Sequence, residues 1–509
     1  MMDLNYVKTE PVTREFLAVL FAGFGNDLNP LTSDHGEDPC PKALLPVANK
    51  PLLEYTLEWL EQSGIRGYSV RLCPQPLAKQ SIDVLLICPS RHRSLIHHHI
   101  HSDVSSAALK IDLQTYDDVL DSHIGTCDLL RQFSSRIKEE FVVVPCDFIP
   151  SPSLRLSDLL NKFRIDAVSE GSLATTCWFA SQPPEKGTFV EEWGIAPTSR
   201  PIVWEPSTGT LLHIDTADDV EDNSEEMELR MSMLSRYPRT RLSSSLEDSH
   251  VYVCRRAVLD LLQEKTHFVS LREEFFPWLC KLQYSRSRRI KHAKSLQGIY
   301  EATSKSLSLQ HSSLLDKNPL EEDDDDDAAS QTDETGFHTS LRVGVIVYKK
   351  AEEPVTRINT LHKFQEVNRR MLASMTYALP VDQKDRSLID QRAQISADSA
   401  VGESTQISER TTIKRSVIGR HCVIGKMVKI TGCVLLDHCI VEDNAKLEGC
   451  ILGKNTQVGQ KAELTRCVTQ AGYEVAAGEV AKAEKLEVSD WMAGHDESDS
   501  SDDAGSDSD

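Results

Sequence analysis

The N-terminal half of the chain alternates short apolar runs with amphipathic segments. Four of these runs are typical of β-strands, and they cover residues 16–21, 82–87, 110–115 and 141–144. Apolar residues at helical spacing indicate helices at 51–64 and 126–133, and a further strand and helix follow at 341–348 and 361–372. Strands that alternate with helices predict an α/β domain with a mostly parallel sheet and ligands at the carboxyl ends of the strands.

A second pattern begins near Ile389, where aliphatic residues recur every five or six positions. The series is Ile389, Ile395, Val401, Ile407, Ile413, Ile418, Ile424, Ile430, Leu436, Val441, Leu447, Leu452, Val458 and Leu464. Ten of its thirteen steps span six residues, which neither a helix nor a simple strand explains. The spacing predicts the hexapeptide repeat of a left-handed parallel β-helix, in which stacked coils cover one inward residue per face.

Five cysteines fall inside this repeat, at positions 422, 433, 439, 450 and 467. We expect them to point inward or to line the corners as small apolar residues, without a redox or metal role.

The two patterns predict more than one domain, as the length of 509 residues allows. The expected parts are an N-terminal extension at 1–13, the α/β domain at 14–380, the β-helix at 387–488 and an acidic tail at 489–509. Low apolar content predicts disordered acidic insertions in the α/β domain at about 218–228 and 302–337.

The formal net charge of -22 is concentrated in three short runs without lysine or arginine. Residues 218–228, 321–327 and 496–509 hold seven acids each, which leaves the rest of the chain almost neutral. Such a remainder has no global field to steer nucleic acid, so we expect no direct nucleic-acid binding.

The thirteen cysteines include no Cys-x-x-Cys pair, and no apolar stretch approaches about 18 residues. No signal peptide is evident at the start. We therefore expect a reduced, cytosolic protein without a membrane segment or structural zinc.

The first apolar run leads into a glycine loop, LFAGFGNDLNPLT at 20–32, and PKALLPV follows at 41–47. Together these segments resemble the signature of sugar-nucleotide pyrophosphorylases, whose loop reads Gly-x-Gly-Thr-Arg-Leu-x-Pro-Leu-Thr. The resemblance implies a Rossmann-like nucleotidyltransferase (pyrophosphorylase-like) domain, a fold that in some members is joined to a left-handed β-helix.

The loop departs from the family pattern at Asn26 and Asp27, which replace Thr-Arg. In that family the arginine helps to neutralise the triphosphate and the departing pyrophosphate. One charge pair at about 4 Å and an effective dielectric near 20 is worth roughly 4 kcal/mol, so reversing its sign replaces attraction with repulsion. We predict that the fold has lost the reaction, with no catalytic residue, metal or cofactor.

Gly23, Gly25 and Lys42 would still be able to hold phosphate, through backbone N–H groups and one positive charge. The alternative is a tight turn retained for packing. Because Asp27 lies in the loop, we favour the turn and interpret these residues as a vestigial nucleotide-binding loop.

Asp147 stands at the end of the 141–144 strand, where the family has a magnesium-binding aspartate, but the second family aspartate has no match. It is expected to be a vestige or a helix-capping group, since Mg²⁺ usually needs a second carboxylate or substrate phosphates. Gly125 and Thr126 resemble the Gly-Thr block that contacts the base in this family, and helix initiation explains them equally well.

A histidine cluster at His97, His98, His99 and His101 is predicted to be a solvated surface. Adjacent histidines do not share a helix face, and no acidic or cysteine partner has suitable spacing for a metal.

Further segments resemble the gamma subunits of the guanine-nucleotide exchange factor for eukaryotic translation initiation factor two. They lie at 248–253, 259–262, 272–277 and 415–419, and the resemblance covers about residues 14–488. The epsilon subunits share this layout but add a C-terminal helical domain, for which the 21 residues after Val488 leave no room.

The resemblance implies pairing with an epsilon-type catalytic subunit, in a complex with alpha, beta and delta subunits that releases GDP from the initiation factor two GTPase. Such exchange needs no covalent chemistry, so this chain would supply surface and scaffold. The competing hypothesis is an active sugar-1-phosphate guanylyl- or uridylyl-transferase that makes a nucleotide-sugar. The glycine loop, Lys42 and Asp147 support this alternative.

Overall fold

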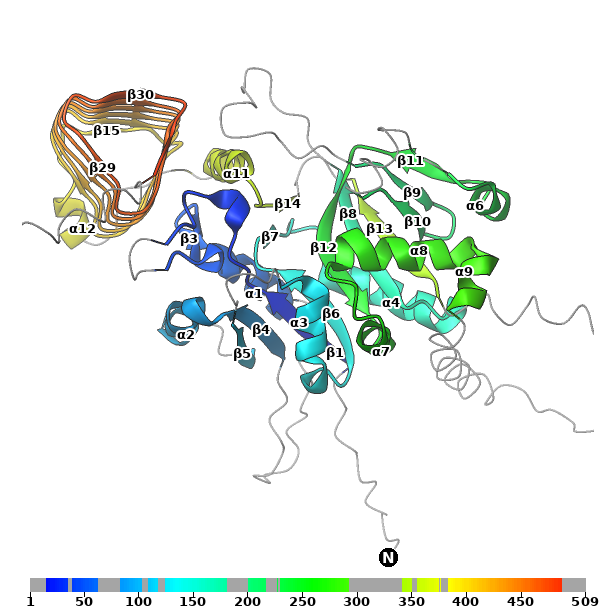
Figure 1. Ribbon diagram of the computed structural model, residues 1–509. Helices are drawn as coiled ribbons and strands as arrows, with labels where there is room; N and C mark the ends of the chain where they lie inside the picture. The colour runs from blue at the N-terminus through cyan, green and yellow to red at the C-terminus, as the bar shows by residue number, and fades with distance from the viewer. Residues whose placement is uncertain are drawn as a thin grey trace, which may run out of the picture. The chain divides into compact units, whose positions relative to one another are not determined.

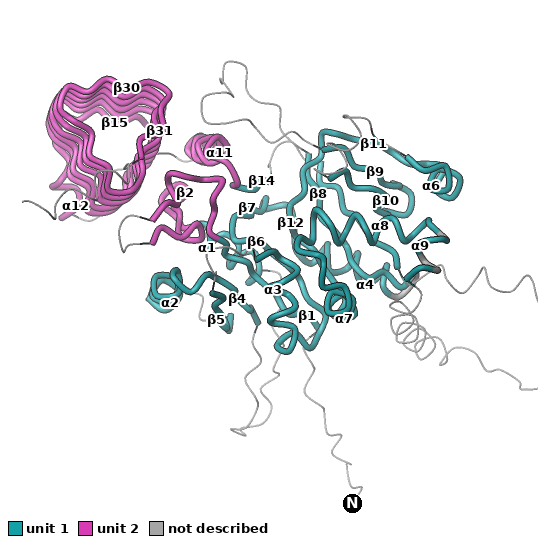
Figure 2. The backbone as a smooth tube through the Cα atoms, viewed as in Figure 1, with its two compact units in different colours: residues 1–23, 52–186, 197–358 teal, residues 24–51, 187–196, 359–509 magenta. Residues whose placement is uncertain are grey.

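The computed structural model describes two compact units of the chain. It covers residues 15–34, 39–62, 83–102, 109–117, 124–180, 200–216, 227, 229–292, 341–349, 355–374, 376 and 383–487. Unit 1 comprises 1–23, 52–186 and 197–358, and unit 2 comprises 24–51, 187–196 and 359–509 (Figure 2). The two units are defined by contacts between residues within the chain. The domain bounds expected from the sequence therefore remain predictions. Both acidic insertions and the tail lie outside the described residues, apart from position 227.

Unit 1 is built on one ten-stranded sheet in the order β11-β9-β10-β13-β8-β12-β6-β1-β4-β5 (Figure 1). Its strands are β1 (Phe16–Phe21), β4 (Val84–Pro89), β5 (Ile111–Tyr116), β6 (Glu140–Pro145), β8 (Ala174–Ala180), β9 (Ile202–Glu205), β10 (Thr210–Ile214), β11 (Arg241–Ser243), β12 (Leu246–Cys254) and β13 (Val343–Tyr348). Strands β5, β4, β1 and β6 pair in parallel, and β12 then joins β6 and β8 in antiparallel orientation. The predicted parallel arrangement is therefore confirmed for β1, β4, β5 and β6. Most strand pairs on the β12 side of β6 are antiparallel.

Helices and short elements connect these strands. They are α1 (Leu52–Gln62), α2 (Arg93–Ser102), α3 (Thr126–Gln132), α4 (Leu156–Glu170), α6 (Met231–Arg236), α7 (Ala257–Glu264), α8 (Phe276–Tyr284) and α9 (Arg286–Lys291), with η3 (Ser90–His92), η4 (Ser134–Arg136), the π-helical turn η5 (Leu271–Phe275) and the strand pair β7 (Phe148–Ile149) and β14 (Thr356–Arg357). Strands β1, β4 and β6 are buried along nearly their whole length, which explains their continuous apolar sequence.

The repeats of unit 2 form a parallel β-helix with three faces. The first face is β15 (Gln394–Ile395), β18 (Thr412–Lys414), β21 (Lys429–Thr431), β24 (Lys446–Glu448), β27 (Glu463–Thr465) and β30 (Val480–Lys482). The second is β16 (Ala400–Val401), β19 (Val417–Ile418), β22 (Val434–Leu435), β25 (Ile451–Leu452), β28 (Val468–Thr469) and β31 (Lys485–Leu486). The third is β17 (Gln406–Ile407), β20 (Val423–Ile424), β23 (Ile440–Val441), β26 (Gln457–Val458) and β29 (Glu474–Val475).

One coil of this β-helix takes 17 residues over most of its length. Ile424 pairs with Val441 and Val441 with Val458, each 17 positions on. One residue of the predicted inward series is wrong: Leu435, and not Leu436, pairs with Ile418 and faces inward. Two adjacent leucines cannot both face inward, since neighbouring strand residues point to opposite sides.

The cysteines of the repeat confirm the prediction that they fill its interior. Cys422, Cys433, Cys439, Cys450 and Cys467 are at most 1% exposed and belong to the core cluster of the β-helix. The Cys422 thiol donates to the Leu436 carbonyl at 3.3 Å, and the Cys439 thiol to the Gly453 carbonyl at 3.1 Å. These thiols occupy corners as small donors.

The second face is covered from outside by other parts of unit 2. Its outward residues Val417, Val434, Ile451 and Val468 are buried although they lie outside the interior cluster. Helix α11 (Leu361–Ser374) is tied to this side by Gln365, whose amide donates to the Gly449 carbonyl at 3.0 Å.

The segment that precedes α1 is tied to the same body. Asn49 donates to the Ile418 carbonyl at 2.9 Å, and Ala48 donates to the Asn368 side chain on α11 at 2.8 Å. This segment contains η1 (Asn26–Leu28), η2 (Lys42–Leu44), β2 (Pro46–Val47) and β3 (Lys50–Pro51), and α12 (Gln383–Ser387) precedes the first coil. Residues 24–32 of the glycine loop therefore belong to the same compact unit as the β-helix.

A buried carboxylate at the start of β6 makes stability depend on pH. Burial raises the pKa of Glu140 from 4.5 to about 7, although Arg255 and a hydrogen bond from the Arg256 backbone N–H oppose the shift. The folded state then binds more protons than the unfolded state between pH 4.5 and 7, so ionising Glu140 destabilises the fold as pH rises through that window.

We expect Glu140→Gln to remove this dependence. Between pH 5 and pH 8 the free energy of unfolding of the wild type should fall by about 2–3 kcal/mol relative to the variant, because the variant has no carboxylate to ionise. Urea unfolding of both proteins at the two pH values measures the difference. Equal changes in both proteins would contradict the assignment to Glu140.

Candidate functional site

The glycine loop turns at Gly25, whose φ of 86° is in the left-handed region. A Cβ on Gly25 would lie 2.9 Å from both Cβ and Cδ of Lys42, so the lysine stem packs directly on the loop. The Thr32 hydroxyl donates to the Gly25 carbonyl at 2.8 Å and closes the turn. The structure thus brings Gly25 and Lys42 together and gives both a packing role.

The two residues that depart from the family signature lie in η1, where Asn26 and Asp27 are exposed. Water screens the charge of an exposed carboxylate. The repulsion between Asp27 and a phosphate is therefore weaker than the value of roughly 4 kcal/mol given above for a charge pair. Gly23 is exposed as well, and a Cβ added there would meet no atom within 4 Å.

Gly125 immediately precedes α3 and Thr126 is its first residue, and the two contact Val269 and Leu271 at the start of η5. A Cβ on Gly125 would lie 2.2 Å from the Val269 carbonyl oxygen, and the Thr126 hydroxyl accepts a hydrogen bond from the Leu271 backbone N–H at 2.9 Å. The Asp128 carboxylate accepts from the Gly125 N–H at 3.1 Å. These contacts account for the Gly-Thr pair by helix initiation and packing.

Asp147 follows β6 and is 1% exposed. Its carboxylate accepts a hydrogen bond from Nε of Arg357 on β14 at 3.0 Å, and its backbone carbonyl accepts from the Ile358 N–H at 3.0 Å. Burial lowers the pKa of Arg357, and the neighbouring Asp147 outweighs that effect and raises it overall. The position that the family resemblance assigns to a metal ligand therefore has a guanidinium as its counter-charge.

A second buried carboxylate, Asp248 on β12, lies in the electrostatic range of the same Arg357. It is contacted by Nε of Arg272 at 3.2 Å and accepts a hydrogen bond from the Tyr252 hydroxyl at 2.7 Å. Burial raises the pKa of Asp248, and Arg272 is the main group that opposes the rise. Sequence reasoning missed this cluster, although both residues lie in segments that carry the family resemblance.

The predicted residues are divided between the units. Gly25, Asn26, Asp27 and Lys42 belong to unit 2, whereas Gly23, Gly125, Thr126 and Asp147 belong to unit 1 (Figure 2).

The histidines of α2 are not all solvated. His97, His98 and His101 are exposed, but His99 is buried and its Nε2 lies 3.1 Å from a carboxylate oxygen of Glu54, which corrects the prediction for this residue. The reason is helical geometry, because His99 faces α1 while its neighbours face away. Across the ranges the structure describes, no group of three or more His, Cys, Asp or Glu side chains is placed to hold a metal ion.

Comparisons with known proteins agree with both halves of this architecture. A protein-family model described as the EIF2B subunit epsilon LbH domain matches residues 381–480. The translation initiation factor eIF2B subunit gamma of Schizosaccharomyces pombe is 30% identical over 410 residues, which are 80% of this chain and 75% of the relative. The chain belongs to the family of eIF2B gamma subunits.

Other relatives extend the same relationship. The eIF2B subunit gamma of Dictyostelium discoideum is 24% identical over 75% of this chain and 83% of its own length. The eIF2B subunit epsilon of the same organism is 22% identical over 61% of this chain and 39% of that relative. The β-helix is accordingly of the left-handed type, and the family supports a translation-factor function over an active sugar-nucleotide transferase.

Among the helices that the structure describes, none combines the length and the apolar content that a bilayer crossing requires.

The ion pair between Asp147 and Arg357 yields a test by double substitution. Arg357→Met should destabilise the protein by about 3–5 kcal/mol, because it leaves a buried carboxylate without a counter-charge. Adding Asp147→Asn to Arg357→Met should restore most of that loss. Free energies of unfolding from urea titrations measure both effects. A double variant as unstable as the single one would show that the pair does not cause the loss.

Proposed function

We propose that this chain is a non-catalytic subunit of eIF2B that pairs with an epsilon-type catalytic subunit and promotes GDP release from the initiation factor two GTPase. The observation that carries the proposal is the 30% identity to an eIF2B gamma subunit over 80% of the chain, which spans both the α/β sheet and the β-helix. Alpha, beta and delta subunits complete the proposed complex, which acts in the cytosol and without direct contact to nucleic acid.

The buried ion pair of Asp147 supports the non-catalytic part of the proposal. A magnesium ion needs free carboxylate oxygens, and the guanidinium of Arg357 donates to this carboxylate instead. Gly23, Gly25, Lys42, Gly125, Thr126 and Asp147 are then vestigial counterparts of the family's nucleotide-binding residues, and Asn26 and Asp27 are the positions that break its signature.

Nucleotide exchange suits a chain of this kind because it needs coupling free energy and no bond chemistry. A partner that binds the nucleotide-free GTPase more tightly than the GDP form lowers GDP affinity by the same factor. Coupling of about 1–3 kcal/mol corresponds to about 5–150-fold in affinity. A rigid scaffold contributes by holding the catalytic partner and the GTPase in register.

The third face of the β-helix supplies a surface for subunit pairing. Val423 on β20 and Ile440 on β23 are 41% and 39% exposed and lie next to each other in register. Met427, in the turn after β20, is 50% exposed. We assign this apolar patch of Val423, Met427 and Ile440 to the interface with the epsilon-type subunit. The family model that matches residues 381–480 of this chain is described as a domain of epsilon subunits, which supports a β-helix of the same type in the partner.

GDP release tests the function directly. The purified pair of this chain and an epsilon-type subunit should release fluorescent GDP from the GTPase about fivefold or more faster than the epsilon-type subunit alone. The chain alone should release neither GDP from the GTPase nor pyrophosphate from a nucleoside triphosphate mixed with a sugar phosphate and Mg²⁺. Equal rates for the pair and for the epsilon-type subunit would refute the helper role, and sustained pyrophosphate release would favour the transferase instead.

Substitutions on the third face test the interface. Val423→Lys combined with Ile440→Lys should weaken binding of the epsilon-type subunit by about tenfold or more, which is about 1.4 kcal/mol, because two ammonium groups would be desolvated in an apolar contact. Gln457→Lys is the matched control, since Gln457 is exposed on the next strand of this face. Biolayer interferometry measures the affinities. A control as damaging as the double variant would argue against the apolar patch.

A further inference from the structure

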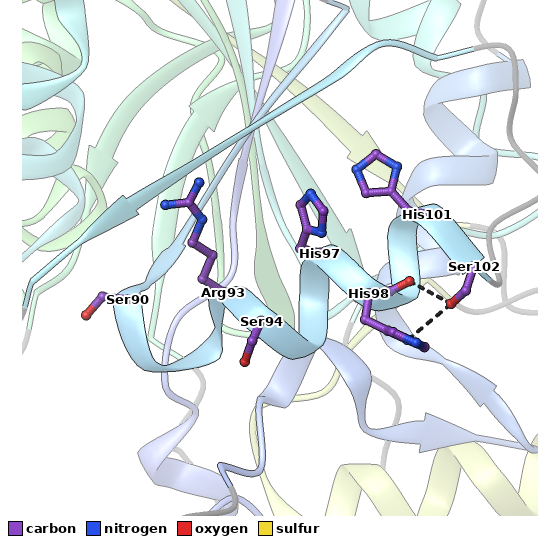
Figure 3. Close-up of a pocket in the computed structure, with 7 residues that line it drawn as sticks. All are labelled: Ser90, Arg93, Ser94, His97, His98, His101 and Ser102. Carbon is purple, nitrogen blue, oxygen red and sulfur yellow. Dashed lines mark hydrogen bonds between the residues drawn. The ribbon is translucent and has the colours of Figure 1, made fainter.

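The outer side of α2 carries two histidines one helical turn apart. His97 and His101 are exposed, and their ring centroids are 4.2 Å apart with an angle of 57° between the ring planes. Both rings project to the same side of the helix (Figure 3). His98 points to the other side, where its ring nitrogen lies 3.2 Å from the Ser102 hydroxyl.

The spacing of His97 and His101 is one at which two imidazoles on a helix can bind the same metal ion. Ring nitrogens bind Zn²⁺ at about 2.0–2.1 Å, and two histidines at positions i and i+4 of a helix present them on one face. At these bond lengths and N–metal–N angles of about 90–109°, two ring centres lie about 4.5–5.2 Å apart, so the observed separation of 4.2 Å places the rings slightly closer than a shared ion would. A rotation about the side-chain torsions of exposed residues is enough to aim both nitrogens.

The surroundings leave room for the remaining ligands. The two histidines line an open cavity of about 800 Å³ together with Ser90, Arg93, Ser94, His98 and Ser102. No carboxylate or thiol lines it, so water would complete the coordination shell. Arg93 lies one turn before His97 and its positive charge opposes a cation, which limits the affinity of the site.

We propose that His97 and His101 form a binding site for a divalent transition-metal ion, with Zn²⁺ as the ion it holds. Imidazole donors favour Zn²⁺, Cu²⁺ and Ni²⁺ over Mg²⁺ or Ca²⁺, which prefer oxygen. The site lies on the outer surface of a helix and is separate from the Asp147 cluster in its residues and chemistry. It adds a metal-dependent feature to a subunit whose proposed function needs no metal.

Metal titrations of the full chain without an affinity tag test this site. Zn²⁺ is titrated by calorimetry into wild type and into His97→Ala, His101→Ala and His98→Ala. The first two variants should each lose the tightest binding event or weaken it about tenfold or more, because a single imidazole holds the ion poorly. His98→Ala is the matched control and should bind as the wild type does. Circular dichroism confirms that the variants keep their helix content.

A second readout identifies the donor atoms. Electron paramagnetic resonance of one equivalent of Cu²⁺ should show coupling to two imidazole nitrogens in the wild type and in His98→Ala, and to fewer in His97→Ala. Arg93→Gln should bind Zn²⁺ more tightly, since it removes a nearby positive charge. The proposal is overturned if His98→Ala weakens binding as much as the other variants do. It is also overturned if His97→Ala and His101→Ala leave the isotherm unchanged, or if Arg93→Gln abolishes binding.

Discussion

A buried charge must have a counter-charge, and this requirement governs the interior of unit 1. The side chains of Asp147 and Asp248 are only 2% and 5% exposed, and the chain supplies a guanidinium to each, from Arg357 and Arg272. Taking an unpaired ion out of water costs several kcal/mol, so the folded state depends on these contacts being made within the chain. The Asp147 and Asp248 carboxylates are thereby used for stability.

The extent to which sequence predicts this structure depends on the range of the interactions involved. Strands β1, β4, β5 and β6 were predicted because their apolar pattern is local, and the β-helix was predicted because its spacing repeats. The choice between Leu435 and Leu436 was wrong because both are apolar and only stacking against Ile418 decides. The antiparallel part of the sheet was not predicted, since its partners are far apart in the chain.

The candidate site shows the same limit. Gly25 and Lys42 were assigned to one loop because a short motif contains both, and the structure packs the Lys42 stem on Gly25, a contact that the sequence did not predict. Arg357 lies 210 residues from Asp147, on a strand of two residues, so no local pattern indicates that the two side chains meet. His99 was misassigned because the contact that buries it comes from Glu54 on another helix. Contacts between residues far apart in the chain, rather than residue type, decide which polar side chains are buried in pairs and which are exposed to bind a ligand.

The 17-residue coil limits how the length of this chain can change. Inward residues at the first, second and third faces keep their columns only if the chain advances by a whole coil, as it does from Ile424 to Val441 to Val458. Loss or gain of one or two residues within a strand would rotate every later side chain out of its column, whereas loss or gain of 17 residues would only shorten or lengthen the stack. Genes for such a protein therefore tolerate insertions and deletions in the corners or in whole-coil steps, and the β-helix changes in height while its cross-section stays constant.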